Sequence, residues 1–436
     1  MFKIKKGDIK LIKDTFEIKQ GIKAHIIENE LFKTNIVCVL LTVPLTNENV
    51  TNNALVPFFI RSGSKNYNSQ LEINKTLEEM YGASFDCGID KMGDNQVLKF
   101  YIEGINDEFL PNKENLLQDM INLILELVFN TNIKNGKFDD EIFNIEKENL
   151  KQVIEGKIDD KDYYAFETCI SKMYGDNGFG LFKYGKVEDI EKLDSKVIAD
   201  YYKKLINTAK IDIFVAGNIV NKNIKEIINK NDNLKKLPPR SENYILNNEY
   251  TESKQKVDNI QEINEKMDIT QGKLVIGLDI LSKQDNLQPI ALVYNSILGS
   301  GANSMLFQNV REKASLAYSA RSVYIRQKGN IFIRCGIEIE NYNKALNLIK
   351  EQVCNIAKGE FSDEDIENAK SYLIAGIKAI PENQDSELIF YIGAEIAKTD
   401  ISLTNYIEKI QNVTREEIIE FANQMQYNTI YFLKGN

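Results

Sequence analysis

The chain has 436 residues, roughly two to three times the length of a typical domain, so two or more packed cores are expected. Its 64 acidic and 54 basic residues are mixed along the sequence and give a formal charge of −10, with no basic block that would bind nucleic acid. The basic amino-terminal segment has no apolar stretch behind it, and no window is apolar enough to span a membrane, which predicts a non-exported, cytoplasmic protein without a membrane partner.

The titratable residues limit the chemistry further. The five cysteines are scattered without a C-x-x-C pair, so neither disulfides nor cysteine-bound zinc is expected. His25 is the single histidine, and we interpret it as a half-buried or solvent-facing strand residue. Because zinc hydrolase sites draw on two or three imidazoles, the chain cannot build such a centre alone.

The elements expected in the first part of the chain mix strands and helices. β-Branched, apolar or alternating runs predict strands at 36–45, 95–105 and 211–219. An apolar stretch ending in glycine predicts a helix at 54–63, and helical patterns follow at 71–89, 116–128 and 138–150.

The second part shows the same order. Strands are expected at 273–281, 329–339 and 429–436, and helices at 289–301, 304–324, 345–356 and 361–373. Between the two parts lies a polar stretch with two adjacent prolines, which is typical of a linker. We therefore expect an α+β fold of two homologous domains, each a largely antiparallel sheet with packed helices, at 1–228 and 269–436 around a linker at 229–268.

The segment LGSGANSMLFQNVREKASLAYSARS, residues 298–322, resembles the signature of the carboxy-terminal domain in the insulinase/pitrilysin metallopeptidase family. Further resemblance covers LEEMYGASFDCGIDKMGDNQVLKFYIEG, GLFKYGKVEDIEKLDSKVIADYY and VAGNI, in the family's order. The resemblance implies a bilobal, clam-like subunit that pairs with a second subunit around a chamber for unfolded peptides.

The family's metal motif, H-x-x-E-H, belongs on the first apolar helix. At the matching positions this chain has Ala54, Pro57 and Phe58, which can neither ligate zinc nor accept a proton. Glu146, or alternatively Glu148, falls where the family keeps a distant third ligand, and we interpret it as a surface charge. No cofactor is therefore expected in this chain, and the resemblance implies zinc in a partner subunit.

Arg311 and Tyr318 match the pair that the family's carboxy-terminal domain presents to substrate. Their seven-residue spacing would bring both to one helical face if the helix continued that far. A guanidinium and a phenol can both donate hydrogen bonds to a carbonyl oxygen that gains charge during hydrolysis. We expect Arg311 and Tyr318 to bind the substrate carbonyl in trans, beside a zinc-bearing partner.

Three functions are weighed from these residues. The first is a zinc-less subunit of a processing peptidase, in a heterodimer with a zinc-bearing homologue or as a homodimer in isolation. The second is a peptide-binding scaffold without proteolytic role, since some zinc-less members that the segment at 80–95 resembles are associated with elongation factor P modification. The third, an independent hydrolase, lacks a G-x-S-x-G elbow and a Cys with a plausible His partner.

Overall fold

The computed structural model describes residues 12–176, 178–219, 222–240, 259–281, 287–399 and 402–435. The chain divides into two compact units. Unit 1 contains residues 1–154, 183–247 and 381–392, and unit 2 contains residues 155–182, 248–380 and 393–436. Among the described residues, no helix is both long and apolar enough to cross a membrane.

Unit 1 is built on a six-stranded sheet with the order β1-β2-β6-β3-β5-β4. The strands are β1 (Ile12–Lys19), β2 (Ile22–Glu28), β3 (Thr34–Pro44), β4 (Ser84–Met92), β5 (Asn95–Ile105) and β6 (Lys210–Gly217). Strands β2 and β6 run parallel, and the other neighbouring pairs are antiparallel. The nine residues from Asn35 to Val43 in β3 are all buried, as a continuous run of mostly apolar residues in a central strand predicts.

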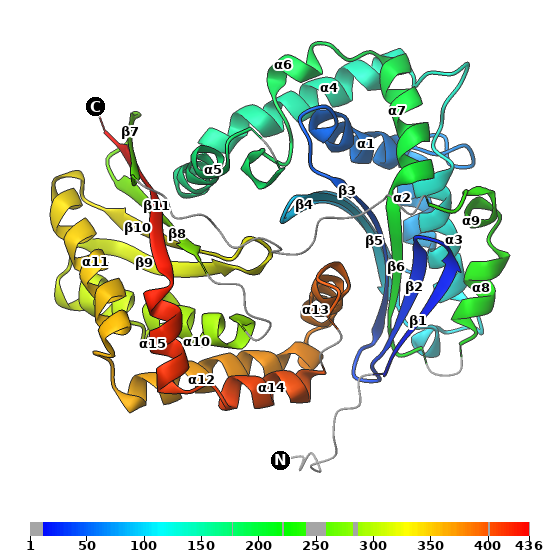
Figure 1. Ribbon diagram of the computed structural model, residues 1–436. Helices are drawn as coiled ribbons and strands as arrows, with labels where there is room; N and C mark the ends of the chain where they lie inside the picture. The colour runs from blue at the N-terminus through cyan, green and yellow to red at the C-terminus, as the bar shows by residue number, and fades with distance from the viewer. Residues whose placement is uncertain are drawn as a thin grey trace. The chain divides into compact units, whose positions relative to one another are not determined.

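Helices cover one face of this sheet and close the first core. They are α1 (Val50–Ser62), α2 (Gln70–Glu79), α3 (Leu116–Phe129), α4 (Asp140–Glu155), α6 (Val187–Ile190), α7 (Ser195–Thr208), α8 (Ile224–Lys230) and α9 (Asp232–Lys236). The core joins strand residues such as Val39 and Phe100 to helix residues such as Phe59 and Ile124. Figure 1 shows α3, α8 and α9 on the same side of the sheet.

Unit 2 is built on a five-stranded sheet with the order β7-β11-β8-β10-β9. The strands are β7 (Gln261–Lys266), β8 (Gly272–Ile280), β9 (Ala317–Ile325), β10 (Asn330–Ile337) and β11 (Met425–Lys434). Only β7 and β11 run parallel. This order and these directions correspond to β2-β6-β3-β5-β4 of unit 1, so the expected α+β class with two sheets and packed helices is confirmed.

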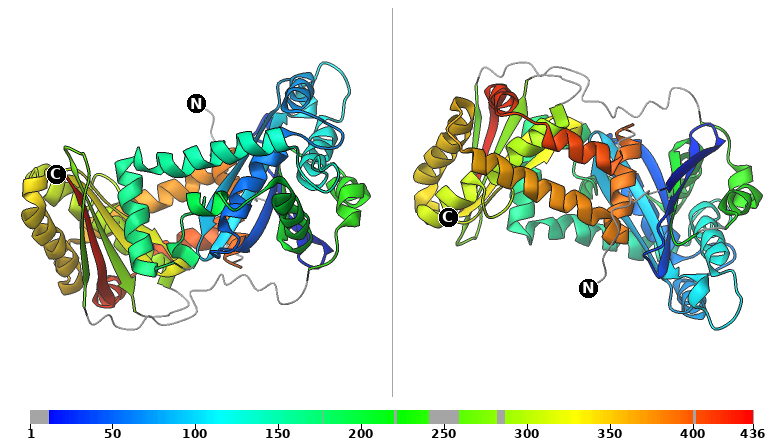
Figure 2. Two further views of the ribbon diagram at one scale, coloured as in Figure 1. Left: turned by 90° about the horizontal axis from the view of Figure 1, so that it is seen from above. Right: turned by 90° about the horizontal axis from the view of Figure 1, so that it is seen from below.

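The sheet of unit 2 is covered on both faces. One face packs against α10 (Leu287–Gly299), α11 (Tyr342–Lys358), α12 (Asp363–Ala379), α14 (Leu403–Gln411) and α15 (Arg415–Asn423). The other face packs against α5 (Lys161–Tyr174), whose Ala165, Cys169 and Ile170 contact Phe332 and Tyr431. Figures 1 and 2 show the dark yellow α11 and the teal α5 on opposite sides of this sheet.

The contacts divide the chain differently from the order of the sequence. Residues 155–182 fall inside the expected domain 1–228 but pack with unit 2, because the second face of its sheet requires an apolar cover. Of the expected linker 229–268, residues 232–236 form α9 and residues 261–266 form β7, which pairs with β11. Residues 241–258 of that linker lie outside the described residues.

Residues 381–392 belong to unit 1 and begin α13 (Gln384–Ile396). The Gln384 amide donates to the carbonyl oxygens of Thr34 and Ala216 at 3.1 and 3.2 Å. The Asn29 amide donates to both carboxylate oxygens of Glu387 at 3.2 Å. Burial raises the pKa of Glu387 from its usual value of 4.5 to about 7, against the opposite effect of the Asn29 bond.

This raised pKa makes the stability of unit 1 depend on pH. Between about pH 4.5 and 7 the folded chain keeps a proton on Glu387 that the unfolded chain has released, so stability falls as pH rises through this window. Glu387→Gln removes the buried charge, and we expect it to raise the melting temperature at pH 8 by about 2 °C or more and to change it little at pH 5. The control is the exposed Glu382→Gln, and an equal loss of stability at both pH values would contradict the prediction.

Candidate functional site

The face of α1 on which the sequence led us to expect the family's metal motif has no ligand atoms. Ala54 and Pro57 are buried and Phe58 is partly buried against the core of unit 1. An alanine methyl, a proline ring and a phenyl ring offer no donor to zinc. Pro57 also lies inside the helix, where it removes one backbone N–H from the hydrogen-bond ladder.

Three polar groups surround this face. The Cys87 thiol on β4 donates to the Pro57 carbonyl oxygen at 3.5 Å, and burial raises its pKa to about 12. Burial also raises the pKa of Glu146 on α4, which accepts a 2.8 Å hydrogen bond from Asn149. Arg61 acts on both groups electrostatically.

A neutral thiol, one carboxylate and a nearby guanidinium do not form a zinc site, because the positive charge of Arg61 opposes a cation. Within the described part of the chain, no cluster of three metal-ligating side chains includes Cys87 or Glu146. The residues therefore do not fit catalytic zinc. Arg61 is not among the residues predicted from the sequence, although its position seven residues after Ala54 places it on the same face of α1.

Arg311 lies on a π-helical segment, Leu306–Lys313, here called η4. Leu306 and Val310 anchor the segment in the core of unit 2. The guanidinium of Arg311 is 43% exposed, lies 4.6 Å from the centre of the Phe307 ring and is 3.5 Å from the carboxylate of Glu312. The π-helix therefore presents Arg311 to solvent on a fixed base, and such segments are frequent at functional sites.

Tyr318 lies on β9, so the expected helix at 304–324 and its shared helical face are wrong. The helix ends at Lys313, and Ser315 turns the chain with a φ of 52° before β9 begins at Ala317. The amide of Leu316 then bonds the carbonyl oxygen of Val310 at 3.0 Å. The amphipathic pattern continues through this turn, which is why it suggested a longer helix.

The hydroxyl of Tyr318 is held by a carboxylate. It donates to Glu338, immediately after β10, at 3.1 Å, and the Asn341 amide donates to the other oxygen of Glu338 at 3.2 Å. This hydrogen bond and the negative charge of Glu338 raise the pKa of Tyr318, so the phenol keeps its proton. Tyr318 is 60% exposed. No signal in the sequence pairs Glu338 with Tyr318.

His25 is fully buried, which corrects the expectation of a half-buried or solvent-facing residue. Its Nε2 lies 3.0 Å from Asp212, its Nδ1 lies 3.0 Å from the Thr15 hydroxyl, and its ring stacks on Phe214. Burial tends to raise the pKa of Asp212, but His25 and Lys210 together hold it below its usual range. The network ties β1, β2 and β6 together.

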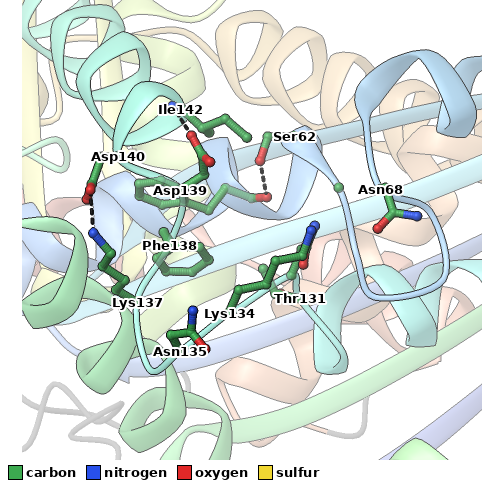
Figure 3. A pocket seen from close by; sticks show the side chains of 13 residues that line it. Ser62, Asn68, Thr131, Lys134, Asn135, Lys137, Phe138, Asp139, Asp140 and Ile142 are labelled. Atoms are coloured by element: carbon green, nitrogen blue, oxygen red, sulfur yellow. Dashed lines mark hydrogen bonds and ion pairs between the residues drawn. The ribbon is translucent and has the colours of Figure 1, made fainter.

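A polar cavity of about 350 Å³ lies in unit 1 beside the end of α1 and the start of α4 (Figure 3). Its lining includes Phe59 and Phe138, whose rings stack with centroids 4.1 Å apart. Lys137 pairs with Asp140, and Asp139 accepts the amide of Ile142 at the start of α4. The cavity contains neither the face of Ala54 and Phe58 nor the Thr15–His25–Asp212 network.

Comparison with known proteins gives a consistent result. Residues 192–373 match the model described as the peptidase M16 inactive domain. The chain is 32% identical over 424 residues to a probable inactive metalloprotease of Bacillus subtilis, covering 95% of this chain and 96% of the relative. It is 21% identical to an uncharacterized zinc protease of the same organism, covering 79% and 83%. A conserved protein from Enterococcus faecalis has a similar structure, with a TM-score of 0.86, 28% identity and coverage of 97% and 99%.

The α1 face predicts how the purified chain behaves toward metal. After equilibration with zinc and removal of free metal, we expect well under one zinc per chain by elemental analysis, because Glu146 has no imidazole partners. A bound structural metal would contribute to folding stability. Because we expect no such metal in this chain, a chelator should leave its melting temperature unchanged. Stoichiometric zinc that a chelator removes with a loss of stability would contradict this prediction.

The turn at Ser315 predicts a second result. A positive φ suits glycine and strongly disfavours a β-branched side chain, so Ser315→Gly should keep the free energy of unfolding within about 1 kcal/mol, and Ser315→Val should lower it by about 1–3 kcal/mol. Urea denaturation measures both. The control is Ala314→Val, at a position with a φ of −86°; an equal loss there would show that the turn stores no strain.

Proposed function

Since the chain belongs to the M16 family of peptidases, we propose that it is a cytoplasmic, zinc-less subunit that supplies Arg311 and Tyr318 to a zinc-bearing homologue. The chain itself is an inactive, metalloprotease-like member of the family. Its substrate would be an unfolded peptide. The main support for this proposal is that Arg311 and Tyr318 are both exposed. A protein that only holds peptides has no need of two hydrogen-bond donors for a carbonyl oxygen.

The chemistry of the pair suits this role. Arg311 offers the N–H donors of its guanidinium, and the raised pKa of Tyr318 keeps its phenol in the donor form. When water attacks a peptide bond, the carbonyl oxygen gains negative charge, and a donor aimed at it can contribute about 3 kcal/mol in the transition state. Arg311 and Tyr318 would bind and orient this oxygen.

The partner would be a second M16 chain with an intact metal motif. Its zinc would activate the attacking water, which the α1 face of this chain cannot do. Bacillus subtilis has one relative named a probable inactive metalloprotease and another named an uncharacterized zinc protease, so both kinds of chain occur in one organism. This supports a heterodimer, and a homodimer in isolation is compatible with it.

A second candidate is a peptide-binding scaffold without proteolytic role. The observation that favours it is that β4 and β9 each pair with only one strand among the described residues, so each leaves a sheet edge for an extended peptide. A role in elongation factor P modification would fall under this candidate and rests on the resemblance alone.

The first candidate is tested by reconstitution. The chain alone should not cleave a quenched, unstructured peptide, and its mixture with the zinc-bearing homologue of the same organism should. Arg311→Ala or Tyr318→Phe in the mixture should lower kcat by about tenfold or more with a smaller change in KM, because both donors act mainly in the transition state.

Lys313→Ala, two residues after Arg311 on the same segment, is the control and should leave kcat unchanged. Size-exclusion chromatography should show that all variants still form the complex. A mixture that is inactive, or active and indifferent to both substitutions, would favour the scaffold candidate instead.

A further inference from the structure

The cavity beside the end of α1 and the start of α4 is bounded in part by a tight hairpin turn (Figure 3). Lys134 and Lys137 exchange both main-chain hydrogen bonds, at 3.0 and 3.1 Å, around Asn135 and Gly136. Asn135 and Gly136 have φ values of 52° and 79°, and a two-residue hairpin turn with two positive φ angles strongly favours the sequence Asn-Gly. The turn therefore fixes the two lysines directly opposite each other.

One of these two lysines has no partner. Like charges at directly opposite positions repel each other and destabilise the pair. For Lys137 an anion offsets this repulsion, because it forms an ion pair with Asp140. The ammonium group of Lys134 has no ion pair or hydrogen bond with any described residue. Figure 3 shows the Lys134 side chain pointing away from Asp140.

The carboxylates around the cavity are bonded to other groups of the chain. Asp139 accepts two main-chain amides at the start of α4, at 2.9 and 3.2 Å. Asp140 accepts a 2.5 Å hydrogen bond from the Ser195 hydroxyl in addition to its ion pair. Glu72, which does not line the cavity, accepts the main-chain amide of Asn68 at 2.7 Å. None of the three carboxylates depends on Lys134.

The cavity also contains amide groups that are not used. Asn68 and Asn132 line it, and within the described ranges no residue bonds to either side-chain amide. The hydroxyl groups of Ser62 and Thr131 donate to main-chain carbonyl oxygens at 2.8 and 3.3 Å. The groups left to bind a ligand are therefore mainly N–H donors, and one of them, Lys134, is positively charged. This combination favours an anion.

The remaining lining sets the size of the ligand and adds apolar contact. The volume of about 350 Å³ lies within the range of roughly 300–1,000 Å³ that is typical of small-molecule sites. The stacked rings of Phe59 and Phe138 and the side chain of Ile142 contribute apolar surface. A ligand that matches this lining has an apolar body and one anionic end.

We propose that this cavity binds a small organic carboxylate, whose anionic end bonds to Lys134 and Asn68 and whose apolar part lies against Phe138 and Ile142. A carboxylate has two acceptor oxygens, so it can accept from both donors at once. Its bond to an ammonium group is charge-assisted and stronger than a bond between neutral groups. The cavity is built from unit 1 alone, so binding requires neither zinc nor a partner subunit.

The test uses the full chain alone and measures binding of 3-phenylpropionate and of its uncharged amide by ligand-observed NMR titration. The acid should bind with a Kd on the order of 1 mM, as expected for a ligand of this size. The amide should bind about tenfold more weakly or worse, because it lacks the charge that Lys134 recognises. Acetate and inorganic phosphate should also bind about tenfold more weakly, since they bury no apolar surface.

Substitutions at Lys134 assign the binding to this cavity. Lys134→Gln should weaken binding of the acid about tenfold and leave binding of the amide unchanged, whereas Lys134→Arg should retain binding of the acid. Lys134 is exposed, so both variants should keep the melting temperature of the unmodified chain. The matched control is Lys75→Gln on α2, an exposed lysine outside the cavity, which should change neither titration.

Three results would overturn the proposal: no saturable binding of the acid, equal binding of the acid and the amide, or equal losses in Lys134→Gln and Lys75→Gln. Phosphate that binds as tightly as the acid would show a general anion site and would overturn the assignment to an organic carboxylate. None of these results bears on the proposed function, because the test involves neither Arg311, Tyr318 nor the zinc-bearing homologue.

Discussion

The second face of the unit 2 sheet is apolar and must be shielded from water. The surroundings of the candidate site depend on the helix that covers this face. Val275, Phe332 and Tyr431 present apolar surface on this face, and α5 covers it. Each large side chain buried this way contributes roughly 1.5–3 kcal/mol. One further contact holds the helix: Tyr164 donates to Glu265 of β7 at 2.7 Å, and Glu265 also accepts a 2.8 Å bond from Tyr431 of β11. Asp162, at the start of the same helix, then fixes Arg321 of β9 and Arg334 of β10.

The α1 face without zinc ligands and the exposed pair Arg311 and Tyr318 differ in how they affect stability. On α1, the buried side chains of Ala54 and Pro57 extend the apolar core of unit 1. On η4 and β9 the chain keeps an exposed aromatic ring, a π-helix and a residue with positive φ. Such features carry a cost in stability and persist where something other than packing requires them.

The sequence correctly predicted those strands whose apolar residues form a continuous or an alternating pattern. β3, β5, β6, β8 and β10 were expected within a few residues because their apolar runs are buried or alternate cleanly. The turn at Ser315 was missed because REKASLAY keeps a helical pattern across it. β7 was assigned to the linker because QEINEK is polar and pairs only with β11, more than 160 residues later.

Only those features of the candidate site that depend on residue type alone could be predicted from the sequence. The side chains at 54, 57 and 58 that cannot bind zinc and the candidate pair Arg311 and Tyr318 could be proposed from the sequence, whereas their surroundings could not. His25 was placed on a strand but not in the core, because its partner Asp212 lies 187 residues away. The bond between Asn29 and Glu387 spans 358 residues and leaves no local pattern.

The contact between Tyr318 and Glu338 bears on which function the chain performs. A phenol has one hydrogen to donate, and here Glu338 accepts it. Because both side chains are exposed, solvent screens this bond and it contributes little to stability. A neutral substrate carbonyl would gain little by displacing Glu338, whereas an oxyanion in the transition state can gain about 3 kcal/mol from the same donor. In the proposed peptidase role, the contact would hold Tyr318 with Glu338 until charge develops on the substrate, and a donor that acts at that stage would raise kcat and not only tighten binding.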